Sequence, residues 1–453
     1  RPRVRPRPPS SFGSGSGSGS SGGTRSVLSA RRRAVATVLT LSAAAVGLAS
    51  AQTAAAPPAC SPAFAEVSVS TDAQLASLLR ATNCSEGEFV VSWEGELVFS
   101  EPIVVGNSTT VSVTGVGGGA VLDGGGVSRL FEMSAGASLL LENLGLRNGQ
   151  APDFTGGGGA IVADGEGLNL AATSCTFTNN SSPRDGGVIL STGGSAILEF
   201  HDCIFGGNTA KQHGGALKAD SAAAVSATTT MFLGNRADGG GSDEGKGGAI
   251  YLAGGAPQLA FHDCELRSNN ASDTGGAVFF EAGGGITVNA TRFEGNGARY
   301  SAGGIFAGGE IAEVTVVDAV FASNFVSDIA NWNKEFYVGG ALNVFGEARV
   351  AVSSSVFSGN GAHLGGAAFL RGNHTVTIDG SVFEDNLAFV EGGAVVVSGF
   401  GGIGRFDATF TDTVFNRNWC GGNGGALSAY SGGPGNVTLL RTNFSGNAVA
   451  YRD

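Results

Sequence analysis

Two short motifs alternate along residues 158–447, and this repeat constrains the fold more than any other feature of the chain. One motif is Phe-x-x-Asn, in which Leu266 replaces Phe once. The other is Gly-Gly, usually followed by Ala and an aliphatic residue, beginning at Gly158, Gly186, Gly214, Gly247, Gly275, Gly303, Gly339, Gly365, Gly392 and Gly424. Ten copies of each motif follow one another in strict alternation, with a mean period of about 30 residues. A fixed period of this size predicts a solenoid.

The interior of each repeat indicates short β-strands. Apolar residues lie seven and five positions before the Phe, as in Leu198/Phe200 and Val376/Ile378, and this alternation is typical of a strand. The next small or apolar position lies only two before the Phe, so the chain must bend between two strands. A further apolar pair follows Gly-Gly. We therefore expect coils of three short strands, stacked parallel at about 4.8 Å.

Equivalent residues of successive coils should stack in columns. The second motif always ends in Asn, which predicts a ladder of side-chain amides along the stack. Its members are Asn180, Asn208, Asn235, Asn269, Asn296, Asn324, Asn360, Asn386, Asn418 and Asn447. The Phe residues should stack in the core, and Gly-Gly fits a tight corner with positive φ. Most of the 77 glycines beyond the N-terminal Gly/Ser tract therefore mark bends in a rigid fold.

The paired motifs resemble the repeat of the chlamydial polymorphic outer-membrane proteins, and the resemblance covers about 158–447. It implies an all-β, right-handed parallel β-helix of the pectin-lyase-like type, with about ten to eleven coils. It also implies an adhesin-like role at a cell surface and association with an outer membrane.

The N-terminal segment has the pattern of a targeting sequence. Arg31-Arg32-Arg33 precede an apolar run from Ala34 to Leu48 and the small residues 49–51, which predicts a secretory signal cleaved after Ala51. A signal anchor and a plastid transit peptide are the alternatives. No later stretch reaches the roughly 18 apolar residues of a membrane span. We therefore expect a secreted or cell-surface protein without a transmembrane span in the mature chain.

The net charge of −12 and the concentration of arginines in the leader argue against nucleic acid as a partner.

We divide the chain into a leader and signal peptide (1–51), an N-terminal cap (52–130) and a β-helix domain (131–453). Ser70, Thr71 or Asp72 can cap a short helix at 72–81 within the cap.

Four cysteines are candidates for disulfides. Cys60 and Cys84 flank the expected helix, and an exported protein could bridge them. Cys175 and Cys203 occupy one column in neighbouring coils, where they form either a disulfide or two buried thiols. Without a Cys-x-x-Cys pair, a structural zinc site is not expected.

Catalytic motifs of β-helix enzymes are missing from the sequence. Asn-Thr-Asp, Asp-Asp, Gly-His-Gly and Arg-x-Lys do not occur, and Lys211, Lys218 and Lys246 do not cluster with acids in a recognisable motif. Phe-His-Asp-Cys occurs twice, but its His201 and His262 should lie two coils apart, about 10 Å, too far for one metal ion. We expect no cofactor and no resident metal.

Three insertions, at 236–246, 325–338 and about 398–404, interrupt the regular loops, and the first two leave the same corner. Insertions in solenoids often carry binding. The first contains Asp238, Asp243 and Glu244, weak candidates for calcium ligands. The second contains Trp332, Phe336 and Tyr337, aromatic candidates for contact with an extracellular glycan or protein.

Three hypotheses for function follow. The sequence favours an exported, non-catalytic, adhesin-like or surface-recognition module. The alternatives are a polysaccharide-active lyase or hydrolase on the same fold, and a structural spacer within a larger surface protein.

Overall fold

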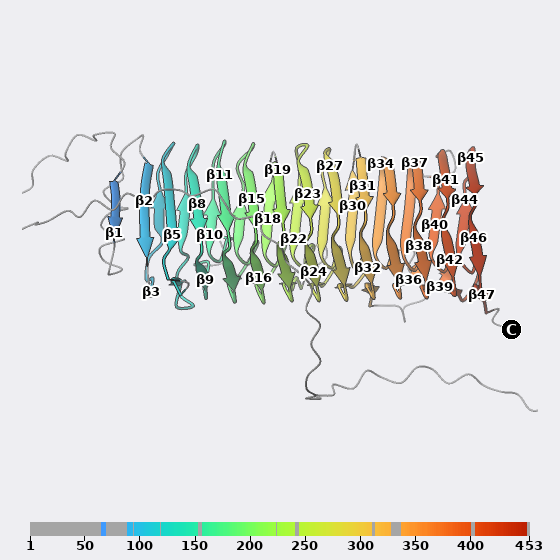
Figure 1. The fold of residues 1–453 in the computed structure, drawn as a ribbon, viewed down its shortest axis with the longest axis horizontal. Helices are drawn as coiled ribbons and strands as arrows, with labels where there is room; N and C mark the ends of the chain where they lie inside the picture. Colours follow the sequence, from blue (N-terminus) through green and yellow to red (C-terminus); the bar gives the residue numbers. More distant parts are fainter. Residues whose placement is uncertain are drawn as a thin grey trace, which may run out of the picture. The chain divides into compact units, whose positions relative to one another are not determined.

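The computed structural model describes residues 65–68, 88–93, 95–117, 119–152, 156–222, 224–240, 244–309, 313–327, 337–399 and 404–450. These residues lie in one compact unit, 59–453, and all their regular elements are β-strands (Figure 1). The strands pair in parallel to form a β-solenoid, which confirms the predicted fold class. The leader, the expected helix at 72–81, Cys60 and Cys84 lie outside the described residues.

Three sheets run along the solenoid, with 24, 13 and 10 strands, and we call them sheets A, B and C. Sheet A has two columns of strands. The A1 column follows the Gly-Gly corners from β10 onward. It contains β4 (Ile103–Val105), β7 (Phe131–Met133), β10 (Ile161–Ala163), β14 (Ile189–Ser191), β18 (Leu217–Asp220), β22 (Ile250–Ala253), β26 (Val278–Glu281), β30 (Ile305–Gly309), β40 (Val395–Ser398) and β44 (Leu427–Tyr430).

The A2 column contains β1 (Ala65–Ser68), β2 (Glu88–Trp93), β5 (Thr110–Gly115), β8 (Ser138–Glu142), β11 (Asn169–Thr173), β15 (Ile197–His201), β19 (Ala224–Thr228), β23 (Gln258–His262), β27 (Gly285–Asn289), β31 (Glu313–Val317), β41 (Phe406–Thr411) and β45 (Gly435–Leu440). Two long strands run through both columns, β34 (Leu342–Ser353) and β37 (Ala368–Asp379).

Sheet B carries the repeat Phe residues. Its strands are β3 (Glu96–Val98), β6 (Val121–Asp123), β9 (Gly145–Arg147), β12 (Thr176–Thr178), β16 (Ile204–Gly206), β20 (Met231–Leu233), β24 (Glu265–Arg267), β28 (Arg292–Glu294), β32 (Val320–Ala322), β35 (Val356–Ser358), β38 (Val382–Glu384), β42 (Val414–Asn416) and β46 (Asn443–Ser445). Sheet B therefore has more strands than the ten to eleven coils that the sequence predicted. Its first two strands, β3 and β6, pair with the rest of the sheet although their segments contain neither repeat motif.

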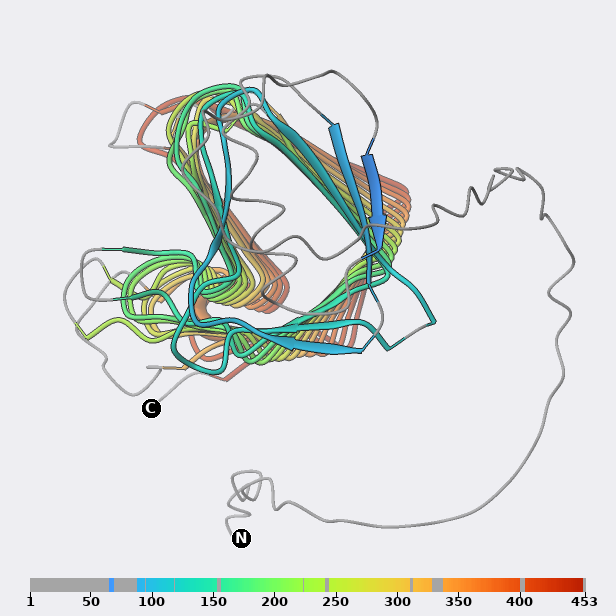
Figure 2. The same ribbon diagram turned by 90° about the vertical axis from the view of Figure 1, so that its left-hand side faces the viewer.

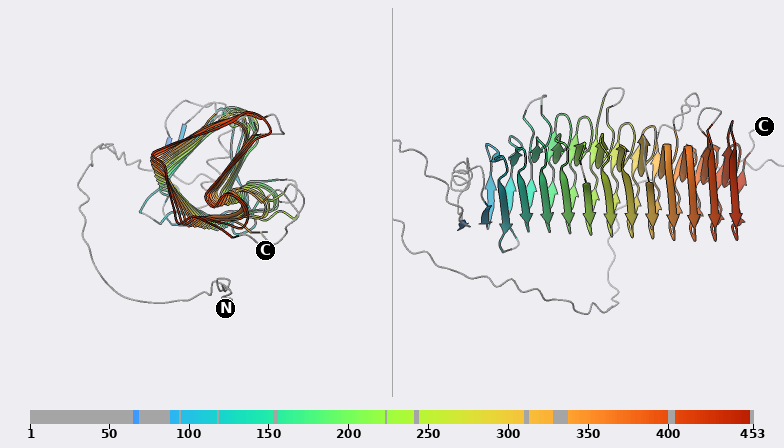
Figure 3. Two further views of the ribbon diagram at one scale, coloured as in Figure 1. Left: turned by 90° about the vertical axis from the view of Figure 1, so that its right-hand side faces the viewer. Right: turned by 90° about the horizontal axis from the view of Figure 1, so that it is seen from above.

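Sheet C follows the ladder asparagines with very short strands, which the sequence did not indicate. They are β13 (Ser181–Ser182), β17 (Thr209–Ala210), β21 (Arg236–Ala237), β25 (Asn270–Ala271), β29 (Gly297–Ala298), β33 (Phe325–Val326), β36 (Gly361–Leu364), β39 (Leu387–Glu391), β43 (Trp419–Cys420) and β47 (Ala448–Val449). Viewed along the stack, successive coils superpose on the sheets, while loops of different length project near one corner (Figures 2 and 3).

Each coil bends at three left-handed residues. The first bend is the predicted Gly-Gly corner, where the first glycine has positive φ in nine coils and Ala302 takes this role in the tenth. The second bend lies three residues before each Phe, at Ser174, Asp202, Thr229, Asp263, Ala290, Asp318, Ser354, Gly380, Asp412 and Arg441. The third directly precedes each ladder Asn, at Asn179, Gly207, Gly234, Ser268, Gly295, Ser323, Gly359, Asp385, Arg417 and Gly446. These φ values lie between 47° and 71°, so the odd spacing before the Phe does mark a bend.

The repeat Phe rings stack along the core as predicted. Neighbouring rings lie nearly parallel, with centroids 4.6 Å apart for Phe177 and Phe205 and 4.7 Å apart for Phe293 and Phe321. Leu266 interrupts the stack. There the ring of Phe261 contacts Phe232 and Phe293 edge-on, at 6.4 and 6.0 Å, and so bridges the two halves of the stack.

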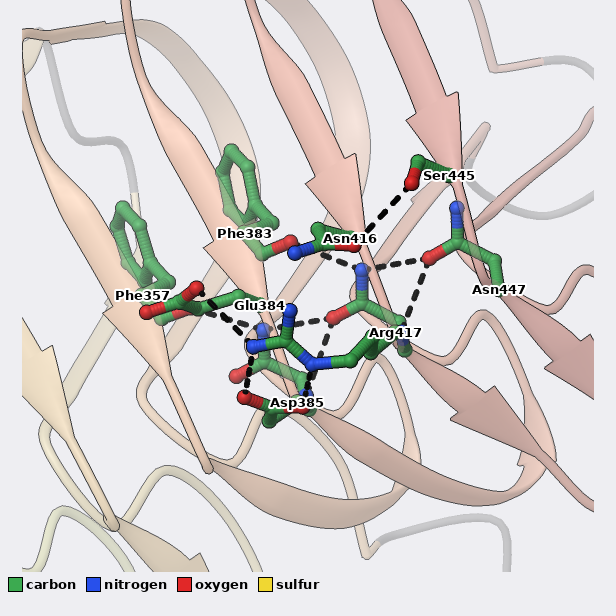
Figure 4. Close-up of polar contacts among 10 residues, drawn as sticks. Phe357, Phe383, Glu384, Asp385, Asn416, Arg417, Ser445 and Asn447 are labelled. Carbon is green, nitrogen blue, oxygen red and sulfur yellow. Dashed lines mark hydrogen bonds and ion pairs between the residues drawn. The ribbon is translucent and has the colours of Figure 1, made fainter.

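The predicted asparagine ladder forms from Asn180 to Asn447. In the central coils, the Nδ2 group of each Asn donates to the Oδ1 atom of the next ladder Asn and to a carbonyl oxygen of the previous coil. The backbone N–H donates to the same Oδ1 atom. Figure 4 shows the last steps of the ladder, beside the two hydrogen bonds from the Arg417 guanidinium to the Asp385 carboxylate.

The ladder geometry does not depend on the length of the intervening loops. The Nδ2–Oδ1 distance is 3.0 Å for Asn324 and Asn360, which are 36 residues apart, and also 3.0 Å for Asn360 and Asn386, which are 26 apart. The insertions at 236–246 and 325–338 both begin with a sheet C strand, β21 and β33, as their shared corner predicts. The third insertion lies elsewhere, between β40 and β41.

Candidate functional site

The outward face of the A1 column carries the densest group of titratable side chains that we find in the described part of the chain. In β18 the alternation of the strand buries Leu217 and Ala219 and turns Lys218 and Asp220 outward. The register places Tyr251 of β22 beside Lys218, and Phe279 of β26 beside Tyr251. Residues that directly precede Gly-Gly, such as Asp185 and His213, flank this face.

A stack of four rings runs across this face. The centroid of His213 lies 4.6 Å from that of Tyr251, which lies 4.9 Å from that of Phe279, and Phe306 continues the stack at 4.9 Å. Both faces of the Tyr251 ring are therefore covered by neighbouring rings. The stack leaves only ring edges and the Tyr251 hydroxyl for contact with another molecule.

Lys218 joins two coils through ion pairs. Its Nζ atom lies 3.1 Å from Oδ2 of Asp185 and 3.4 Å from Oδ2 of Asp220. The other oxygen of Asp185 accepts a hydrogen bond from the backbone N–H of His213. We call Asp185, His213, Lys218, Asp220 and Tyr251 the Tyr251 cluster.

Burial and charge shift the pKa values in this cluster. Burial, followed by the charges of Asp220, Glu281 and Asp185, raises the pKa of Tyr251 to about 12. Burial lowers the pKa of His213 to about 4, so that its imidazole is neutral at pH 7. Burial also raises the pKa of Asp220. The cluster thus offers carboxylates, an ammonium group and a phenol hydroxyl side by side.

The members of this cluster lie far apart in the sequence. Lys218 belongs to no recognisable motif with acids in the sequence, because its partner Asp185 lies one coil earlier, more than thirty positions before it in the chain. The local signal was the alternation Leu-Lys-Ala-Asp after Gly-Gly, which turns two charges outward. Only the stacking of coils adds Asp185 and Tyr251 to them.

The aromatic binding candidates lie partly outside the described residues. This applies to Trp332 and Phe336. Tyr337 is 1% exposed and packs with Val326 and Ala362. Its ring lies 5.8 Å from Tyr300 and 5.0 Å from His363, so it packs against the solenoid and does not offer its ring to a ligand.

The calcium candidates do not converge in the described part of the loop. Asp238 pairs with Arg236 at 3.0 Å, and an oxygen of Glu244 accepts the backbone N–H of Gly240 at 3.2 Å. Asp243 lies outside the described residues. Among the residues that the structure describes, no three His, Cys, Asp or Glu side chains are placed to hold a metal ion.

Cys175 and Cys203 are buried free thiols, one of the two alternatives that the sequence left open. A hydrogen bond with Cys203, together with burial, raises the pKa of Cys175. His201 and His262 both pair with Thr228, so one coil separates them and the two Phe-His-Asp-Cys copies do not form one site.

Residues 174–192 match the model of the Chlamydia polymorphic membrane protein repeat, which confirms the resemblance drawn from the Gly-Gly and Phe-x-x-Asn motifs. No curated protein and no solved structure matches the chain. In the described residues, no helix has the length and apolar character to cross a membrane. The repeat and the β-solenoid together fit a surface-exposed repeat protein.

Proposed function

We propose that this protein is an exported surface-recognition module with an adhesin-like role. Cleavage of the leader after Ala51, and secretion or display at the cell surface, belong to this proposal. The polymorphic membrane protein repeat and the solenoid scaffold support it. The partner is an extracellular glycan or protein.

The observation that carries the proposal is the Tyr251 cluster on the outward face of sheet A. Other outward ion pairs, such as Arg441–Asp412, are more exposed than that between Lys218 and Asp185. The Tyr251 cluster instead gathers charged and aromatic side chains from three successive coils. Such a group on a rigid scaffold suits recognition, because its side chains are held in place before a partner arrives.

The test is saturable binding of the full chain to arrays of glycans and of extracellular proteins. We expect at least one partner whose binding falls about fivefold or more with Asp220→Ala, because a charged contact is lost. Glu313→Ala is the matched control, since Glu313 is an exposed carboxylate on A2 strand β31, away from the cluster. Trp332→Ala tests the inserted loop in the same way. Failure of every array to show saturable binding would favour the structural spacer.

A second candidate, a polysaccharide hydrolase, is favoured by one observation. Asp220 and Glu281 occupy one outward column with only Ala253 between them. Two coil steps separate their backbones by about 9.6 Å, near the carboxyl separation of about 6.5–9.5 Å in inverting glycosidases. Release of reducing ends from a polysaccharide, abolished by Glu281→Gln, would establish this activity.

A further inference from the structure

Lys218 and Asp185 meet in a sheltered part of the Tyr251 cluster. The Nζ atom of Lys218 lies 3.1 Å from Oδ2 of Asp185, and the two side chains are only 14% and 11% exposed. An amine held against a carboxyl group, with little water around them, is arranged for condensation to an amide as well as for an ion pair. The surroundings of the two groups favour this reaction.

Three further contacts place reactive or shielding groups around the pair. The backbone N–H of His213 donates to Oδ1 of Asp185 at 3.1 Å, which holds the carboxyl group and stabilises negative charge on that oxygen during attack by an amine. Oδ2 of Asp220 lies 3.4 Å from the Nζ atom of Lys218, near enough to take a proton from it. The ring of Tyr251 shields the amine, with its centroid 5.5 Å from Nζ.

Asp220 is suited to carry protons at this site. Burial raises its pKa, and the charge of Asp185 acts in the same direction, whereas the charge of Lys218 acts against them. A carboxyl group with a raised pKa accepts and returns a proton at neutral pH more readily than an ordinary aspartate.

A second lysine lies near the cluster but farther from Asp185. The corner of Lys246 stacks on that of His213, which stacks on that of Asp185, so two coil steps separate Lys246 from Asp185. Its Nζ atom lies over the ring of Phe279, 5.1 Å from the centroid. Lys218 is therefore the lysine placed to react, and Lys246 provides a matched control.

We propose that Lys218 and Asp185 form an intramolecular isopeptide bond, with Asp220 as the proton carrier. One proton of the Lys218 ammonium group passes to the Asp185 carboxylate, and the neutral Nζ atom then attacks Cγ of Asp185 to form the N–C bond. Asp220 accepts a second proton from the nitrogen and donates it to the leaving hydroxyl group as the C–O bond breaks. An ammonium group and a carboxylate thus become an amide and one water molecule, and Asp220 returns to its starting state.

This bond would join β18 covalently to the corner that precedes β14, one coil earlier. The reaction needs no oxidant, cofactor or partner, because all of its groups belong to this chain. It therefore goes beyond the proposed function and can be tested without a ligand.

Mass spectrometry of the reduced, denatured full chain tests the proposal, because unfolding separates an ion pair but leaves an amide intact. We expect the mass to be lower than that calculated from the sequence by one water molecule. Trypsin should release residues 185–211 joined to 212–236, since it does not cleave after an acylated Lys218.

Three variants separate the roles of the side chains. Lys218→Arg keeps the positive charge but removes the nucleophilic amine, so the full calculated mass should return. Asp220→Asn keeps both reacting groups and should slow the loss of water at least about tenfold. Lys246→Arg, the matched control, should behave like the unaltered chain. Thermal unfolding of each variant shows that it is folded.

An unaltered chain with the full calculated mass and no joined peptides would overturn the proposal. Loss of water that persists in Lys218→Arg would also overturn it, because the Asp185-Gly186 sequence can lose one water molecule by closing to a succinimide. Equal rates of water loss in Asp220→Asn and in the unaltered chain would contradict the role of Asp220 as the proton carrier.

Discussion

A central ladder asparagine forms hydrogen bonds with groups in the coils on both sides of it. Oδ1 of Asn296 accepts hydrogen bonds from the backbone N–H and the Nδ2 group of Asn269, and its own Nδ2 group donates to Asn324 and to the carbonyl oxygen of Leu266. The side chain is fully buried, so water cannot replace these partners. No other residue type of this size both donates and accepts at the required positions.

We therefore expect Asn296→Ala to lower the free energy of unfolding by about 3 kcal/mol or more, because several buried polar groups lose their partners. Asn447→Ala is the matched control: Asn447 accepts from Asn418 and donates to the carbonyl oxygen of Phe415, but it is half-buried, so water can replace lost partners; its cost should be about 1 kcal/mol. Denaturant unfolding of both variants measures the difference. Equal losses would show that the ladder does not stabilise the central coils.

The left-handed residues show where reading the sequence fell short at this scale. The Gly-Gly corner was predicted, because glycine adopts positive φ without cost. The other two bends use Asp, Ser, Thr, Ala and Arg as well as glycine, for example Asp263 and Arg417. A residue other than glycine costs about 1–2 kcal/mol in the left-handed conformation. The pairing of the parallel strands on either side of the bend imposes this conformation. The spacing of the apolar residues predicted the place of the second bend, but not the residue type that forms it, and no local signal marks the third bend.

Strands of neighbouring coils approach closely at the second glycine of each Gly-Gly pair. A Cβ atom on Gly248 would collide with the carbonyl oxygen of Gly276, and one on Gly276 would collide with that of Gly303. The glycine is thus required by the approach of two coils, in addition to the turn. This explains why the pair is maintained in all ten repeats.

Gly248→Ala should destabilise the fold by about 2 kcal/mol or more, because the methyl group must push two paired coils apart. Gly194→Ala serves as control, since a Cβ atom there meets nothing within 4 Å and should change stability by less than about 0.5 kcal/mol. Thermal unfolding by circular dichroism checks both. A Gly248 variant as stable as the Gly194 variant would contradict the close approach.

The repeat motifs predicted the parallel coils, the core stack and the ladder, because each of these depends on residues that recur in every coil. The short strands of sheet C could not be predicted, because most of them have two residues, too few to show an alternation of buried and exposed positions. The Tyr251 cluster could not be predicted for a different reason. Its members, among them Asp185 and Tyr251, occur once each, and only the stacking of coils brings them together.

At the scale of the whole molecule, buried neutral histidines should make stability depend on pH. Burial lowers the pKa of His213 to about 4 and also lowers that of His374. An unfolded chain binds protons at these residues below about pH 6.5, whereas the folded chain does not. Stability is therefore highest above pH 6.5 and falls as the pH drops toward 4.

We expect the melting temperature to decrease between pH 7 and pH 4.5, with His213 contributing on the order of 1 kcal/mol after allowance for solvent screening and His374 acting in the same direction. Paired carboxylates such as Asp412 have lowered pKa values, and their contribution is lost only at more acidic pH. A His213→Gln/His374→Leu variant should show a flatter profile in this window. An unchanged slope in that variant would assign the acid sensitivity to other groups.

The constancy of the ladder across loops of different length has a practical consequence. Asn235 and Asn269 span the insertion after β21, yet their side-chain hydrogen bond is 3.0 Å long, as it is between coils without insertions. The corner after sheet C is therefore a grafting site: a foreign peptide placed between residues 240 and 244 would be displayed from a rigid scaffold whose register it cannot disturb.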